Sequence, residues 1–119
     1  MSRLTFYAHP GCSTCTVARQ WLVRHGVSFT EKDIRTTPPG LAELRTMLAA
    51  HDGKLSRVSN TSGIEYRSQR LSARLPPLAP EEALRLIGSN GMFVKRPFLI
   101  GPGVALAGFK EAAWAAALV

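Results

Sequence analysis

Cys12 and Cys15 are the residues whose types and spacing most directly predict chemistry. The chain has 119 residues and two cysteines, which two other residues separate. A pair spaced in this way forms a redox-active disulfide, supplies half of a metal site, or consists of two incidental thiols. Because the two positions are so close in the chain, a disulfide between them cannot cross-link distant parts of a fold. We therefore predict a thiol–disulfide redox pair.

A strand and a helix are predicted on either side of this pair. Leu4–Ala8 is a short apolar run typical of a buried strand, and a turn follows it. Ser13 or Thr14 can cap a helix that runs to His25, and Gly26 supplies its stop. The apolar face of this helix is predicted to consist of Val17, Ala18, Trp21 and Leu22.

Their place at the start of a helix predicts unequal roles for the two thiols. The unpaired N–H groups and the dipole at a helix N-terminus favour an anion, so Cys12 is expected to form a thiolate, the nucleophilic form. Cys15 lies one turn further along and faces Cys12. It can attack a mixed disulfide formed at Cys12 and release the partner. We assign Cys12 as the attacking residue and Cys15 as the resolving residue.

Two other interpretations of the cysteines stay open at this point. The pair could be two small core residues, or it could bind zinc. A zinc site needs two further ligands, but the chain has no second C-x-x-C motif, and His9, His25 and His51 are scattered along it. We assign no metal ligand. His9 either tunes Cys12 or lies in solvent.

The rest of the chain predicts an α/β fold. Val27–Ile34 alternates apolar and polar residues like a second strand, with Val27, Phe29 and Ile34 pointing inward, which makes a parallel βαβ unit with the first strand and helix. Residues 38–91 have a helical pattern that we interpret as an all-helical insert. Further elements are predicted as one or two short helices in Leu55–Leu75, a helix from Pro80, a hairpin over Phe98–Leu106 with a three-residue loop, and a helix over Lys110–Leu118 with Trp114 on its packed face.

This order of elements predicts a four-stranded mixed sheet flanked by helices, in a single domain over residues 1–119. The arrangement is thioredoxin-like, and in such proteins a cis proline at the position of Pro97 packs beside the cysteine pair. We expect a cis peptide bond before Pro97 and place Arg96 near the thiolate, as its cationic neighbour and an anion clamp. Arg96 joins the two cysteines as a catalytic candidate. The candidates for substrate binding are Pro97, Gly11, Ser13, Thr14 and Asn60.

The formal net charge of +7 limits the choice of partners. It indicates either a solvated basic surface or an attraction to anions such as glutathione, an oxyanion or an acidic protein. Direct binding of nucleic acid is not predicted, because the chain lacks an interleaved aromatic pattern and a helix-turn-helix signal. No apolar stretch is long enough for a membrane helix, and the apolar run at the N-terminus is too short for a signal peptide. We expect a cytoplasmic monomer that does not bind membranes.

The motifs together resemble the arsenate reductase (ArsC)/Spx family over nearly the whole chain. The matching pieces are Phe6-Tyr7, Pro10-Gly11-Cys12-Ser13-Thr14-Cys15, Ala18-Arg19-Gln20-Trp21-Leu22, His25-Gly26-Val27, Asn60-Thr61-Ser62-Gly63, Lys95-Arg96-Pro97 and Gly108-Phe109-Lys110-Glu111. The resemblance implies a thioredoxin-like fold with a helical insert.

The branches of this family imply different functions. Its arsenate reductases use one catalytic cysteine, matched by Cys12, and three arginines around the oxyanion. Only Arg96 matches one of these arginines, because the other two would fall near Ser62 and Gly108. Whether Arg57 or Arg67 replaces a missing arginine stays open.

The Spx branch has the C-x-x-C pair and binds the RNA polymerase alpha subunit. A third branch is similar to thiol reductases that work with glutathione. We predict a thiol–disulfide oxidoreductase that uses glutathione or a glutaredoxin- or thioredoxin-type thiol donor, without a bound cofactor. A redox-sensing regulator that binds the RNA polymerase alpha subunit is the alternative, and arsenate reduction is a weaker third.

Overall fold

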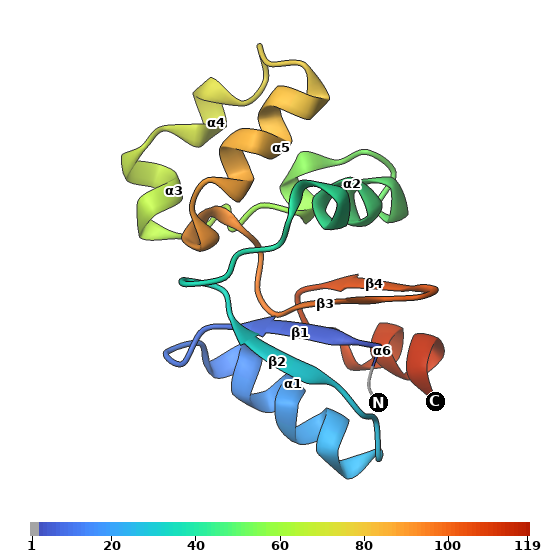
Figure 1. Ribbon diagram of the computed structural model, residues 1–119. Coiled ribbons are helices and arrows are strands. Elements are labelled where there is room, and N and C mark those ends of the chain that lie inside the picture. Colours follow the sequence, from blue (N-terminus) through green and yellow to red (C-terminus); the bar gives the residue numbers. More distant parts are fainter. Residues whose placement is uncertain (1–2) are drawn as a thin grey trace.

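A four-stranded mixed sheet forms the centre of the computed structural model (Figure 1). The model describes residues 3–119, so the first two positions of the predicted domain lie outside it. The strands lie in the order β2-β1-β3-β4. β2 runs parallel to β1, and the pairs β1–β3 and β3–β4 are antiparallel. The predicted fold class is confirmed. The strands are β1 (Thr5–Ala8), β2 (Thr30–Asp33), β3 (Phe98–Gly101) and β4 (Val104–Ala107).

Helices cover both faces of this sheet. α1 (Ser13–Arg24) and α6 (Glu111–Leu118) lie on one face, and the helical insert lies on the other (Figure 1). Alternation along β1 separates the two cores, since successive side chains of a strand point to opposite faces. Phe6 packs into the core with α1 and α6, while Tyr7 packs into the core of the insert.

The insert joins β2 to β3 and contains only helical elements. They are α2 (Leu41–Ala50), the 3-10 helix η1 (Leu55–Arg57), α3 (Ile64–Ser68), α4 (Leu71–Arg74), α5 (Pro80–Gly88) and the 3-10 helix η2 (Gly91–Phe93). The insert was predicted over residues 38–91, and the helical elements run from Leu41 to Phe93. Leu44, Met47 and Ile87 are fully buried between α2, α5 and the sheet. The Tyr7 hydroxyl donates to Glu43 Oε1 at 2.6 Å and ties β1 to α2.

The predicted start of the second strand at Val27 was wrong. Gly26 has φ +68°, and the amide of Val27 donates to the carbonyl of Leu22 at 3.0 Å. This hydrogen bond closes the C-terminal end of α1, as a left-handed glycine after a helix commonly does. The chain therefore pairs with β1 only from Thr30 onward. Of the residues predicted to point inward, Ile34 is fully buried, while Val27 and Phe29 are half-buried.

Two smaller predictions also need correction. The hairpin loop has two residues instead of three, because Gly101 pairs with Val104 and so belongs to β3. Val17 was predicted on the packed face of α1, but 51% of its surface is exposed. The packed face of α1 consists instead of the buried residues Cys15, Ala18, Trp21 and Leu22, and Val17 does not belong to it.

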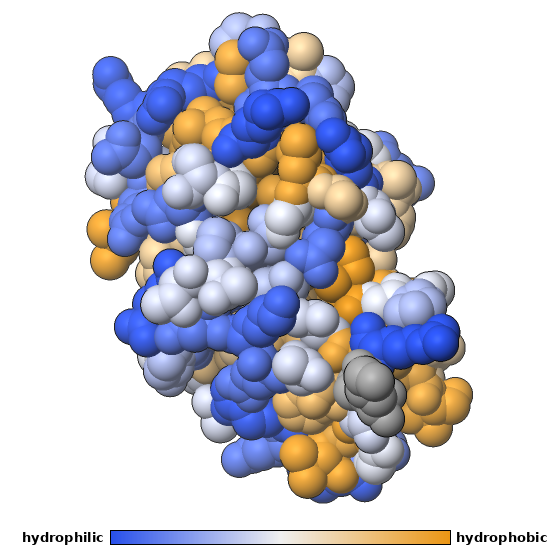
Figure 2. Space-filling view, viewed as in Figure 1, coloured by the Kyte–Doolittle hydropathy of each residue, from blue (hydrophilic) through white to orange (hydrophobic). Residues whose placement is uncertain are grey.

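Hydrophilic side chains are spread over the sheet half and the insert, with hydrophobic atoms visible between them (Figure 2). No helix within residues 3–119 is both long and apolar enough to span a membrane.

Candidate functional site

Cys12 is the N-cap of α1. Its backbone is extended, with φ −93° and ψ 109°, and its Sγ accepts a hydrogen bond from the amide of Cys15 at 3.2 Å. The predicted caps, Ser13 and Thr14, instead lie inside the helix. A helix N-terminus leaves several N–H groups without backbone partners, and here the sulfur of Cys12 takes one of them. The same contact stabilises negative charge on that sulfur.

Cys15 has a different environment from Cys12. Both are free thiols, but Cys12 is half-buried and Cys15 is fully buried. Burial raises the pKa of the Cys15 thiol to about 12, and the hydrogen bond with Cys12 adds to the increase. The His9 backbone and the positive charge of Arg96 act against it. The structure therefore brings together one accessible sulfur that accepts an N–H and one buried thiol that keeps its proton.

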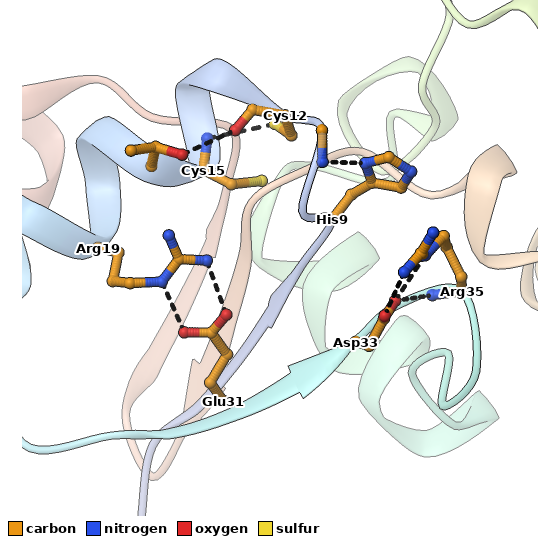
Figure 3. Close-up of polar contacts among 9 residues, drawn as sticks. His9, Cys12, Cys15, Arg19, Glu31, Asp33 and Arg35 are labelled. Carbon is orange, nitrogen blue, oxygen red and sulfur yellow. Dashed lines mark hydrogen bonds and ion pairs between the residues drawn. The ribbon is translucent and has the colours of Figure 1, made fainter.

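The loop before α1 is tied to His9. The imidazole Nδ1 of His9 accepts from the amide of Gly11 at 2.8 Å (Figure 3). The carbonyl of His9 accepts from the amide of Cys12 at 3.0 Å. A Cβ atom at position 11 would lie 3.0 Å from the ring of His9, so glycine allows this close approach. His9 was left without a role in the sequence, and the structure gives it one in shaping the loop that precedes Cys12.

Arg96 and Pro97 join the insert to β3. The peptide bond between them is cis, which confirms the prediction, and Pro97 is buried. Arg96 is half-buried, and its Nη1 lies 3.7 Å from Met92 Sδ. Arg96 lines two cavities, of about 450 and 420 Å³. Arg96 is thus shared by the linings of the two cavities.

The predicted substrate-binding residues separate into two groups. Thr14 lines the larger cavity and Asn60 lines the smaller one, so both lie in hollows that Arg96 borders. Gly11 and Ser13 are exposed and line neither cavity. Asn60 also has a structural role through its backbone. Its backbone N–H donates to Phe93 O at 2.8 Å, and its backbone carbonyl accepts from the amide of Gly63.

The sequence analysis missed several cations of this site. Lys95 and Lys110 line the larger cavity, together with Arg57, which had been considered only as a replacement for a missing arginine. The excess of positive charge was the available signal, but it does not say which cations meet. Another missed group is Arg19, which lies one turn after Cys15 and forms two hydrogen bonds with Glu31, both at 2.7 Å (Figure 3).

Comparison with known proteins gives the family. The model of the ArsC family matches residues 7–117. The chain belongs to the ArsC family. The C-x-x-C pair of Cys12 and Cys15 lies within the matched region.

Similar proteins differ in the functions that their names state. The ArsC-family chain is 38% identical to the uncharacterized protein YusI of Bacillus subtilis over 91% of its own length and 92% of YusI. It is 32% identical to the global transcriptional regulator Spx of Enterococcus faecalis, over 91% of this chain and 80% of Spx. A crystal structure described as a possible arsenate reductase, from Streptococcus mutans, superposes with a TM-score of 0.85 at 35% identity and covers 93% of this chain and 94% of that one.

Ser62 and Gly108, the positions where arginines of ArsC arsenate reductases were expected, line different cavities, and Arg96 lines both. Ser62 lines the smaller cavity and Gly108 the larger one. Gly108 has φ +74°, which favours glycine, and a Cβ atom there would approach Lys95 Cε to 2.8 Å. The side chain of Lys95 therefore occupies the space that a side chain at position 108 would need.

Proposed function

We propose that this ArsC-family protein is a thiol–disulfide oxidoreductase with Cys12 as its nucleophile. The inequality of the two thiols carries the proposal. Cys12 is half-buried and its sulfur accepts the amide of Cys15, whereas Cys15 is buried and its pKa is raised. A partly accessible nucleophile followed by a buried resolving thiol is the order that thiol–disulfide exchange needs.

The reaction begins when the thiolate of Cys12 attacks one sulfur of a substrate disulfide. A bond forms between Cys12 and that sulfur, and the other half of the substrate leaves as a thiolate. Cys15 then attacks Cys12 Sγ, its proton passes to the leaving thiolate or to water, and the second half of the substrate is released. The substrate gains two electrons, and the protein ends with a Cys12–Cys15 disulfide.

A thiol donor must then reduce this disulfide before the next turnover. We propose glutathione, or a glutaredoxin- or thioredoxin-type protein, as the donor, and the cytoplasm as the compartment where such donors keep protein thiols reduced. Arg96 steadies the anionic groups of the reactants, and Pro97 shapes the groove beside the cysteines. The position of Arg96 supports this role. Its positive charge lowers the pKa of Cys15 and so opposes the larger effect of burial, which raises it.

The test is a single-turnover reaction of the pre-reduced protein with bis(2-hydroxyethyl) disulfide, followed by mass spectrometry. Wild type should release two thiols for each protein molecule and lose both free cysteines. Cys15→Ser should stop at a stable mixed disulfide on Cys12, because the resolving thiol is missing. Cys12→Ser should not react. A Cys12→Ser protein that still consumes the disulfide would contradict the proposal.

The similarity to Spx supports a second candidate, a redox-sensing regulator that binds the RNA polymerase alpha subunit. The chain spans about four-fifths of the length of the Spx of Enterococcus faecalis. The test is capture of the purified alpha C-terminal domain by the reduced and by the oxidised protein. Binding in one redox state would favour the regulator, and no binding in either state would exclude it.

Arsenate reduction is the weakest of the three candidate functions. Serine and glycine stand at positions 62 and 108, which leaves Arg96 as the one arginine that matches the expected clamp. We propose that an arsenate reduction assay coupled to glutaredoxin will give no turnover above that of a Cys12→Ser control. Reduction at a rate that depends on Cys12 would reverse this conclusion.

A further inference from the structure

The larger of the two cavities beside Arg96 has an unusual lining. It has a volume of about 450 Å³, within the range of sites for small molecules. One of its lining residues, Thr14, lies in the first turn of α1, the helix that begins at the two cysteines. The other residues come from η1, from the chain before β3, from the end of β4 and from the start of α6, namely Arg57, Lys95, Arg96, Ala107, Gly108, Phe109 and Lys110.

The charges around this cavity are uncompensated. Its lining includes the cations of Arg57, Lys95, Arg96 and Lys110 and no acidic side chain. Within residues 3–119, the ion pairs join Arg19 to Glu31, Arg35 to Asp33 and Arg45 to Glu81, so none of them involves a cation of the cavity. Like charges held together repel one another, and an anion bound among them relieves this repulsion.

Gly108 keeps the cavity open to Lys95. Its positive φ turns the chain between β4 and α6, and the absence of a side chain leaves room for the aliphatic part of Lys95. The carbonyl of Gly108 accepts from Trp114 Nε1 at 3.0 Å, which fixes the turn against the core. Lys95 is also held from the insert side, since its amide donates to Val58 O at 2.9 Å, next to Arg57. Lys95 is therefore attached to a firmly held part of the backbone.

We infer that this cavity binds the carboxylates of the substrate, and that the substrate is the disulfide of a small thiol bearing acidic groups. The inference rests on the proposed oxidoreductase function and assigns Arg57, Lys95 and Lys110 as specificity-determining residues. A neutral thiol would leave the four cations unmatched, and an amine-bearing thiol would be repelled. Since a cavity of this size fits a small molecule, the structure favours a small disulfide over a protein segment.

Three disulfides with two-carbon arms test the inference, because they differ in charge and hardly in size. They are 3,3′-dithiodipropionate, a dianion; bis(2-hydroxyethyl) disulfide, which is neutral; and cystamine, a dication. Single-turnover rates with the pre-reduced protein are divided by the rates of the same disulfides with dithiothreitol, which removes their intrinsic reactivities. We expect the normalised rates to fall from the dianion to the neutral compound to the dication, and the preference to shrink in 0.5 M salt.

Two variants locate the effect in the cavity. Arg57→Gln and Lys110→Gln should each lower the ratio of the normalised rate with the dianion to that with the neutral disulfide about three- to fivefold, as expected for exposed charge pairs. Arg57→Lys should recover most of the loss. Lys54→Gln is the matched control, since Lys54 is exposed, lies three positions before Arg57 and does not line the cavity.

The outcomes separate this inference from the proposed function. If none of the three disulfides reacts, the oxidoreductase function itself fails. If all three react with equal normalised rates, the oxidoreductase stands and the inference about the cavity is overturned. If Lys54→Gln slows the dianion as much as Arg57→Gln does, net charge explains the preference, and the assignment of the cavity is also overturned.

Discussion

The amide of Cys15 donates a hydrogen bond to the sulfur of Cys12 at 3.2 Å, across the first turn of α1. Cys15 thus supports the sulfur of Cys12 through its backbone, while its own side chain is buried on the core side of the helix. One turn of helix therefore makes two cysteines of the same chemistry unequal. The first prediction tests this inequality directly.

Alkylation should distinguish the two cysteines. Because the pKa of Cys15 is raised to about 12, this thiol stays protonated at neutral pH, and its burial excludes the reagent. Reduced protein treated with iodoacetamide at pH 7.5 should be labelled at Cys12, with Cys15 reacting at least about a hundredfold more slowly. Peptide mass spectrometry locates the label. Equal labelling of both cysteines in the folded protein would disprove the assigned roles, and labelling in 8 M urea provides the control.

Stability should also fall at alkaline pH because of Cys15. Its pKa is higher in the folded protein than in the unfolded chain, where an ordinary thiol titrates near pH 9. The folded state then binds more protons above that pH, so the free energy of unfolding decreases as the pH rises from about 9 toward 12. The effect is measured by urea unfolding of reduced protein at pH 7.5 and pH 10. Cys15→Ala should weaken this pH dependence, while an undiminished dependence would point to other groups.

His51 should make the protein less stable in mild acid. Burial, together with the positive charge of Arg57, lowers the pKa of this imidazole, and its Nε2 is buried without a hydrogen-bond partner within residues 3–119. The unfolded chain then binds the proton more tightly, so stability is complete above about pH 6.5 and is lost as the pH falls below it. Urea unfolding at pH 5 and pH 8 measures the difference. His51→Gln should reduce it, and a variant with the same acid sensitivity as wild type would refute the assignment.

Gly91 should tolerate no side chain. It lies at the start of η2, where the end of the insert meets its beginning, and a Cβ atom there would overlap the carbonyl of Ile34. The carbonyl carbon and oxygen of Ile34 belong to the backbone, so neither can move aside at little energetic cost. Gly91→Ala should lower the free energy of unfolding by about 3 kcal/mol or more. Gly40→Ala is the matched control, because φ is −73° and no atom lies within 4 Å of the added carbon. Equal stability of the two variants would contradict the prediction.

Arg70 should be replaceable by glycine with a gain in stability. It precedes α4 with φ 56°, a left-handed conformation that costs a residue with a side chain about 1 kcal/mol or more. Arg70→Gly should raise the free energy of unfolding by about 0.5 kcal/mol, since glycine also loses more chain entropy on folding. Arg67→Gly, inside α3, should instead lower it by up to about 1 kcal/mol. Thermal unfolding measures the stability of both variants. A change of the same sign in the two variants, relative to wild type, would rule out this explanation.

The features that the sequence predicted well are local. The cysteine pair at the start of a helix, the helical pattern of residues 38–91 and the hairpin over Phe98–Leu106 each depend on neighbours within a few positions. Two of the errors were local too, and a competing hydrogen bond caused each of these two. Val27 looked like the start of a strand, but its amide closes α1. Ser13 and Thr14 looked like caps, but the sulfur of Cys12 accepts the N–H group that a cap would take.

By itself, the sequence determined the chemistry of this protein. The spacing of Cys12 and Cys15, their place between a strand and a helix, and the excess of positive charge all follow from residue types and short-range order. The tertiary structure alone decided which charges meet. Arg57 of the insert and Lys110 before α6 line one cavity beside Arg96, and exposed cations carry no periodic pattern that would reveal such a meeting. Only the packing of the insert against the sheet brings Arg57 to the cavity that Thr14 of α1 and Lys110 also line.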